Sequence, residues 1–249
     1  TWAVRTAFMR RNLDDWEQGE KFGTEYTTEQ IERFSPHSKA IFEIQSASDL
    51  EILEKIYDKS ELLGDEGWGV QYQREFDLSN DSHLWKSAPF WSKKGLASTP
   101  LGFWVKKSGS DSESRNLLPL YQGKMIWQYD HAFSAYGKNG KAKWEEQPWG
   151  NKAISPQYLM AGEHHEWSSG IKLVIRDVSS PTNRRTVIAS CIPDFPCGHK
   201  TPVLRQANTG WKKTLVLSTV LNSLAFDYVV RLRFAISGGG GSLIWALLR

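Results

Sequence analysis

One short stretch of the sequence concentrates side chains that could bind a polyanion. Residues 119–136, PLYQGKMIWQYDHAFSAY, bring Lys124, Gln128, Tyr129 and His131 close together among aromatic residues. Such a mixture can neutralise phosphates, read the edges of bases and stack on rings. The alternative is that the Asp–His pair in this stretch is a structural hydrogen-bonded pair at the end of a strand.

Two other groups of residues are weaker candidates for chemistry. Glu75, Asp77 and Asp81 could supply the carboxylates of a metal-dependent nuclease, but acidic residues that flank a turn more often cap its backbone. Cys191 and Cys197 precede a histidine with a spacing that matches no standard zinc site, so isolated thiols are expected. The sequence also lacks glycine-rich phosphate loops and a G-x-S-x-G motif. We therefore predict no catalytic residue and no metal site.

Local patterns in the first third of the chain predict helices followed by a strand. A capping box at residues 27–30 predicts a short helix that must end near a Ser-Pro pair. A second capping box, at residues 48–51, predicts a helix that runs to about residue 62 and ends at Gly64. Alternating apolar and polar residues at 70–76 then predict a short strand.

The C-terminal half contains a predicted hairpin and a long helix. Alternation at residues 171–176 and 186–191 predicts two antiparallel strands, whose connection would project Arg184 and Arg185. A continuous apolar face predicts one helix over residues 215–233, followed by a glycine tract. Together these elements predict an α+β fold with mixed helices and antiparallel strands.

Charge divides the chain into an acidic and a basic part. The first hundred residues hold 12 Lys and Arg against 18 Asp and Glu, whereas the rest hold 19 against 10. We expect a tail or linker at residues 1–25, an acidic N-terminal α/β part at 26–100 and a basic part at 101–249. The boundary would lie near an exposed, serine-rich loop at residues 108–114. Such a basic part suggests a polyanionic partner.

Length and composition are those of a globular protein with one large or two small domains. The chain has 249 residues, of which 40% are hydrophobic and 24% charged, and no apolar stretch reaches the roughly 18 residues of a membrane span. It begins without Met or an apolar signal core, so we expect an internal segment of a cytoplasmic protein that has no membrane partner. Its twelve tryptophans could fill the core or, alternatively, form the stacking surface of a carbohydrate-binding module.

Four blocks of sequence, in order, resemble one protein family. They are DLEILEKIYDKSELLGDEGWGVQYQREFDLSNDSHLW, LPLYQGKMIWQYDHAFSAY, IRDVSSPTNRRTVIASCIP and VLNSLAFDYVVRLR. They resemble the region after the catalytic domain in large adenine-specific DNA methyltransferases, the type IIG and related restriction-modification and phage-defence enzymes. The resemblance covers roughly residues 30–235 and implies a fold like a DNA target-recognition domain.

The resemblance also implies what this chain lacks. The family's catalytic domain binds S-adenosylmethionine and carries an Asn-Pro-Pro-Tyr motif, and neither that motif nor a glycine-rich methyl-donor loop occurs here. This chain would therefore hold no cofactor and would not be an enzyme by itself. Its partners would be double-stranded DNA and the catalytic methyltransferase domain of the same parent protein. The C-terminal end, FAISGGGGSLIWALLR, departs from the family pattern, which leaves its contact with DNA in doubt.

The DNA-binding residues that we expect fall into two sets. The phosphate contacts would be made by Lys124, Arg184, Arg185 and Lys200. The base-reading contacts would be made by Gln128, Tyr129 and His131. Asp130 would orient His131 or an arginine, because a carboxylate that faces phosphate is unfavourable. The alternative for the two arginines is that they are solvated charges at a loop tip.

Overall fold

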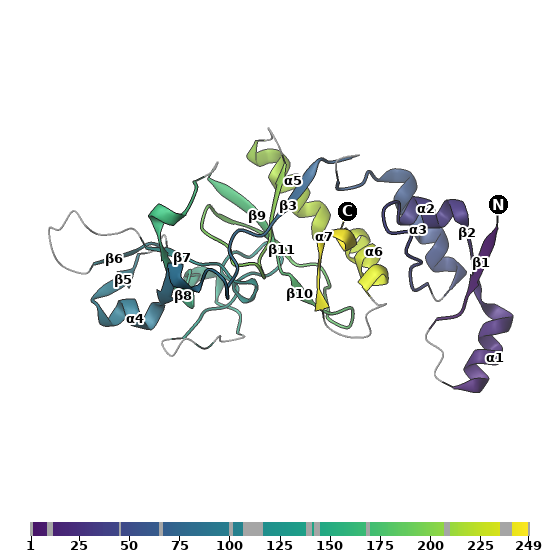
Figure 1. The fold of residues 1–249 in the computed structure, drawn as a ribbon, viewed down its shortest axis with the longest axis horizontal. Coiled ribbons are helices and arrows are strands. Elements are labelled where there is room, and N and C mark those ends of the chain that lie inside the picture. The colour runs from purple at the N-terminus through teal and green to yellow at the C-terminus, as the bar shows by residue number, and fades with distance from the viewer. Residues whose placement is uncertain are drawn as a thin grey trace. The chain divides into compact units, whose positions relative to one another are not determined.

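The computed structural model describes residues 2–8, 12–44, 46–64, 67–99, 102–106, 117–137, 141, 145–167, 170–206, 210–234 and 241–248. They form helices and antiparallel sheets, which confirms the α+β prediction (Figure 1). The chain folds into two compact units. Unit 1 comprises Thr1–Gly69, Ser180–Thr186 and Leu224–Arg249, and unit 2 comprises Val70–Ser179 and Val187–Ser223. The expected boundary near residue 100 therefore falls inside unit 2, and the serine-rich loop at 108–114 lies outside the described residues.

The described part of the first 25 residues forms two strands and a helix, although a tail or linker was expected. Strand β1 (Ala3–Thr6) pairs with β2 (Thr24–Thr27) in antiparallel register, and helix α1 (Leu13–Phe22) lies between them in the chain. Tyr26 on β2 is 1% exposed and donates its hydroxyl to the carbonyl of Phe42 at 2.8 Å. This buried tyrosine ties the segment to the core.

The two predicted capping boxes have different outcomes. At helix α2 (Thr28–Phe34), Thr27 and Gln30 cap each other as predicted. Helix α3 (Ala47–Lys59) begins two residues earlier than predicted, because Ser46 and Asp49 form its box, and it ends before Gly64. Helices α6 (Leu224–Phe234) and α7 (Trp245–Leu248) and strand β13 (Gly241–Ser242) complete unit 1. Its core consists of Tyr26, Ile31, Phe34, Phe42, Ile44, Leu53 and Val229.

The prediction of one helix over residues 215–233 is wrong. The chain forms helix α5 (Trp211–Leu221) and then α6, with Asn222 as the C-cap of α5. The Asn222 side chain donates to the carbonyl of Ala189 at 2.9 Å and accepts from its N–H at 3.1 Å. These bonds to a distant strand end the helix where local periodicity would continue it. Among the described helices, none is long and apolar enough by itself to cross a membrane, and α5 and α6 meet those criteria only as a pair.

Unit 2 contains a four-stranded antiparallel sheet, sheet 1. Its order is β11 (Ala189–Pro193), β9 (Ile171–Ile175), β12 (Val203–Gln206) and β3 (Val70–Gln73). The pairing of β9 with β11 confirms the predicted antiparallel strands, and β3 confirms the strand predicted from residue 70. Helix α5 packs on β9 and β11, and strand β10 (Val178–Ser179) follows β9 in the chain.

A second sheet of unit 2, sheet 2, has five short antiparallel strands. Its order is β4 (Trp85–Ser87), β8 (Tyr158–Ala161), β7 (Leu117–Pro119), β6 (Trp104–Lys106) and β5 (Leu96–Ser98). Helix α4 (Ala88–Lys93) links the two edge strands and places Trp91 against Trp104, Leu117 and Leu159. Single 3-10 turns lie at Ser82–Leu84, Gly123–Met125, Trp149–Asn151 and Gly162–His164.

Candidate nucleic-acid interface

The predicted polyanion-binding stretch lies in unit 2 and is held in place by Arg176. The Arg176 guanidinium donates to the carbonyls of Gly123 at 2.8 Å and Ile126 at 2.6 Å. It also lies 5.0 Å from the centre of the Trp127 ring. Burial lowers the pKa of Arg176 to about 10. This arginine therefore braces the stretch from the inside.

The expectation that Asp130 orients His131 or an arginine is wrong. Asp130 is buried, accepts from the N–H of Ala132 at 3.0 Å and forms an ion pair with Lys152 at 2.5 Å. His131 is half-buried, and its backbone carbonyl accepts from the hydroxyl of Tyr121 at 3.2 Å. Asp130 is therefore a structural residue of the stretch, with a lysine as its partner.

Tyr129 is the most prominent side chain of this stretch. Its φ is 59°, in the left-handed region, and 56% of its surface is exposed. Its N–H donates to the carbonyl of Ala189 on β11 at 3.1 Å. The left-handed region costs a residue other than glycine about 1–2 kcal/mol. A strained backbone that holds an exposed ring suits a contact residue.

Lys124 and Gln128, from the same stretch, differ in how exposed their side chains are. The Lys124 side chain is exposed on the 3-10 turn that also contains Gly123. The amide of Gln128 donates to the side-chain oxygen of Asn222 at 3.2 Å, so it already bonds to the end of α5. Lys124 and Tyr129 are thus the exposed members of the predicted set in this stretch.

The three remaining predicted residues lie in different settings. Lys200, in unit 2, forms an ion pair with the buried Asp177 at 2.9 Å. Arg185, in unit 1, is almost buried and lies 3.9 Å from the Asp227 carboxylate. Arg184 is exposed in unit 1, and its backbone carbonyl accepts from Arg231 at 3.4 Å. The seven predicted residues are therefore divided between the two units, with five in unit 2 and two in unit 1.

The loop that carries the two arginines packs within unit 1. The N–H of Thr186 donates to Asp227 on α6 at 2.8 Å, and Arg231 of the same helix donates to the carbonyl of Pro181. Arg231 also pairs with Asp227 at 3.0 Å. The loop is thus anchored to α6 by buried polar contacts.

Glu75, the first carboxylate of the candidate nuclease site, belongs to a group of charged residues in unit 2. We call this group, Glu75, Lys172, Arg205, Asp194 and His165, the ion network. Glu75 pairs with Lys172 at 2.8 Å and with Arg205 at 3.0 Å. Lys172 also pairs with Asp194 at 3.1 Å, and Asp194 lies 3.3 Å from His165. The side chains of Lys172, Glu75, Asp194 and His165 are all less than 9% exposed. These four side chains are therefore shielded from solvent, and Arg205 is the exposed member of the ion network.

The other two carboxylates of that cluster cap a turn. Asp77 accepts from the N–H groups of Asn80 at 3.0 Å and Ser79 at 2.9 Å, and these bonds lower its pKa. Asp81 accepts from the N–H of Asp77 at 2.8 Å. Within the described part of the chain, no three His, Cys, Asp or Glu side chains are placed to hold a metal ion, and both cysteines are free thiols.

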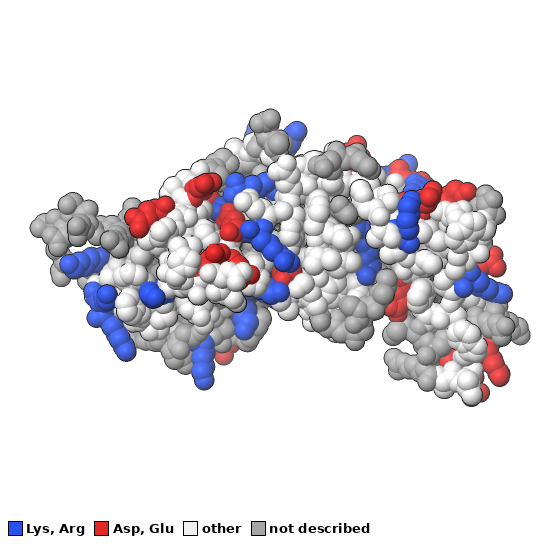
Figure 2. All heavy atoms as spheres, viewed as in Figure 1, with Lys and Arg blue, Asp and Glu red and all other residues white. Residues whose placement is uncertain are grey.

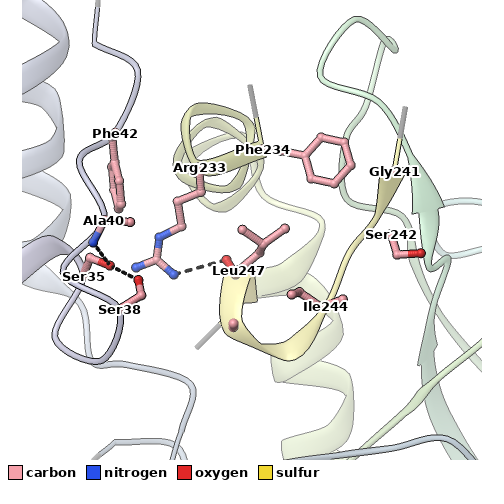
Figure 3. A pocket seen from close by; sticks show the side chains of 11 residues that line it. Ser35, Ser38, Ala40, Phe42, Arg233, Phe234, Gly241, Ser242, Ile244 and Leu247 are labelled. Carbon is pink, nitrogen blue, oxygen red and sulfur yellow. Dashed lines mark hydrogen bonds between the residues drawn. The ribbon is translucent and has the colours of Figure 1, made fainter. Parts of the chain in front are cut away.

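Unit 1 contains a largely apolar pocket of about 390 Å³ (Figure 3). Phe42, Phe234, Ile244 and Leu247 line it together with Arg233. The Arg233 guanidinium donates to the carbonyl of Leu247 at 3.1 Å and, outside the drawn residues, to the carbonyl of Phe34 at 2.6 Å. These bonds join α7 to α2, so Arg233 has a structural role in unit 1.

A group of lysines on sheet 2 is not among the residues predicted from the sequence. Lys86 lies on β4, Lys93 and Lys94 at the end of α4, and Lys106 on β6. We call these four residues the lysine face. Basic side chains gather over α4, β5 and β6 on the side shown in Figure 2. The signal was present in the sequence, because residues 82–110 contain five lysines and no Asp or Glu, interspersed with Trp and Phe.

Comparisons of the chain with family models, curated proteins and solved structures found no match.

Proposed function

We propose that this chain is the target-recognition region of an N6-adenine DNA methyltransferase of a restriction-modification or phage-defence system. In this proposal, unit 2 is a DNA target-recognition-like fold that binds duplex DNA for a catalytic domain elsewhere in the parent protein. One observation carries the proposal, the separation of charge between the two units. Unit 2 holds 18 Lys and Arg against 12 Asp and Glu, a net charge of +6, whereas unit 1 holds 13 against 16, a net charge of −3.

The chemistry of adenine methylation explains why such a region is needed. The adenine amino group is paired inside the duplex, so the base must leave the stack before a methyl group can be transferred to it. The catalytic domain would hold the flipped base and S-adenosylmethionine. This chain would bind the flanking duplex through phosphate contacts that release counterions.

The seven expected contact residues can be ranked by the exposure of their side chains. Lys124 and Tyr129 are exposed on a braced stretch of the basic unit, so they are our first choices for a phosphate contact and a stacking contact. Gln128, Arg185 and Lys200 would have to give up or share the contacts described above. Arg184 and His131 remain proposed contacts of lower rank.

Binding of the full chain to a labelled duplex of about 30 base pairs tests the proposal. Fluorescence anisotropy should show weak binding whose affinity falls steeply as salt rises, because phosphate contacts release counterions. Magnesium should weaken the binding as other added salt does, because it competes for the phosphates, and it should not induce cleavage. The double variant Lys124→Ala, Tyr129→Ala should bind more weakly, whereas Lys55→Ala, which removes an exposed charge from unit 1, should bind like the parent.

Three results would contradict the proposal. The first is that no binding occurs at low salt. The second is a salt-independent affinity for oligosaccharides, which would favour a carbohydrate-binding module. The third is magnesium-dependent cleavage that disappears in Asp77→Ala, which would favour a nuclease.

A further inference from the structure

The lysine face lies in a segment of unit 2, residues 82–110, that contains five lysines and no Asp or Glu. Neither the five strands of sheet 2 nor α4 contains an Asp or Glu. The lysines Lys86, Lys93 and Lys94 are exposed. Within the described residues, none of these three lysines forms an ion pair. Since a cation is neutralised by an opposite charge within a few ångströms, their ammonium groups leave a positive surface.

Strand register places Lys86 and Lys106 on one face of sheet 2. Lys86 lies opposite Leu159, and Lys106 lies opposite Leu96. Directly opposite residues of an antiparallel pair share a face of the sheet. Leu96 and Trp91 of α4 both pack against a cluster that contains Leu159, so this is the face that α4 covers. The two lysines therefore belong to the same side of the sheet as α4.

Helix α4 adds two more lysines and an aromatic ring to this side. Lys93 ends the helix and Lys94 caps it. The Lys94 ammonium lies 4.6 Å from the centre of the Phe90 ring, which is 38% exposed. Cations held over a ring face are partly ordered before any partner arrives, which lowers the entropy lost on binding.

We propose that the lysine face binds the phosphate backbone of duplex DNA. The inference rests on the proposed function, and it names a surface that none of the sequence motifs indicated. The argument for this partner is charge complementarity, because duplex DNA carries about one negative charge per 1.7 Å of its axis. The lysine face makes sequence-independent contacts, since ammonium groups on phosphates do not read bases.

A pair of charge-matched triple variants of the full chain tests the inference. The first variant is Lys86→Gln, Lys93→Gln, Lys94→Gln on the lysine face. The second is Lys39→Gln, Lys55→Gln, Lys59→Gln, which removes the same charge from exposed positions of unit 1. Anisotropy titrations with one duplex at several salt concentrations compare both with the parent chain. Circular dichroism and urea unfolding check that both variants remain folded.

The lysine-face variant should bind about 10-fold more weakly or worse at low salt, and its slope of log affinity against log salt should shrink by about 2–3. The unit 1 variant should keep the parent slope. Equal losses in both variants, or parental binding by the lysine-face variant, would overturn the inference while leaving DNA binding in place. Failure of the parent chain to bind DNA would contradict the proposed function instead. A lysine-face variant that loses binding only to anionic lipid vesicles would also overturn the inference.

Discussion

Sheet 1 and sheet 2 of unit 2 use their basic residues in opposite ways. On sheet 1, Lys172 and Arg205 both pair with Glu75, and beside it Lys200 pairs with Asp177. On the side of sheet 2 that α4 covers, Lys86 and Lys93 are exposed, and neither forms an ion pair within the described residues. The strands of both sheets contain Lys or Arg and no Asp or Glu, so their charge composition alone does not distinguish them. The comparison shows that a basic surface depends on where the acidic partners fold.

The difference follows from the cost of burying charge. Lys172 is 2% exposed at its side chain, so its ammonium has lost its hydration and needs compensation by Glu75, Asp194 and the carbonyl of Phe195. Exposed lysines keep their water and need no partner. The ion network therefore contributes to the stability of the fold, whereas the lysine face is available to bind a partner.

The largest expected effect comes from removing the buried lysine. Lys172→Met leaves two buried carboxylates without their shared cation, and we expect a loss of about 3–5 kcal/mol in the free energy of unfolding. The matched control Lys93→Met, at an exposed lysine, should change stability by less than about 0.5 kcal/mol. Urea unfolding followed by circular dichroism measures both. Equal effects of the two substitutions would remove the distinction between the sheets.

A smaller effect should appear at alkaline pH near the ion network. Burial, and then the charge of Glu75, raise the pKa of the Cys197 thiol above its ordinary value. The folded protein therefore keeps this proton, whereas the unfolded chain loses it above about pH 9, so stability falls as the pH rises. Between pH 8 and pH 10, the parent should lose about 1 kcal/mol more than Cys197→Ala.

The pH prediction separates the thiol from other alkaline effects. Partly buried tyrosines such as Tyr136, whose pKa is raised to about 12, destabilise parent and variant alike as the pH rises. The difference between the two urea-unfolding series therefore reports Cys197. Parallel loss in both proteins would show that this thiol ionises as easily in the folded state as in the unfolded chain.

The smallest expected effect concerns Tyr129, which lies against the edge of sheet 1. Tyr129→Gly should be more stable than Tyr129→Ala by about 1 kcal/mol, because glycine adopts a positive φ without strain. Both variants should lose DNA affinity, since both lack the exposed ring. Thermal unfolding and anisotropy measure the two properties. A glycine variant that binds like the parent would exclude Tyr129 as a contact residue.

Short-range patterns in the sequence determined several elements of this protein. The Thr27–Gln30 capping box and the alternation of residues 171–176 depend on residues a few positions apart, and both predictions are confirmed by α2 and β9. The α+β class follows from such patterns. The sequence also shows a cluster of lysines without acidic residues at 82–110. The predicted domain boundary near residue 100 divides this cluster, because it separates Lys86 and Lys93 from Lys106.

Only the tertiary structure decided which charged residues are neutralised. Lys172 and Glu75 are 97 positions apart, and the bonds that end α5 join Asn222 to Ala189. The units themselves are built from segments that alternate along the chain, so Arg184 and Arg185 fall in the acidic unit 1 although the sequence around them is basic. Electrostatic energy depends on distance in space and on burial, and neither quantity is encoded in the spacing of residues along the chain.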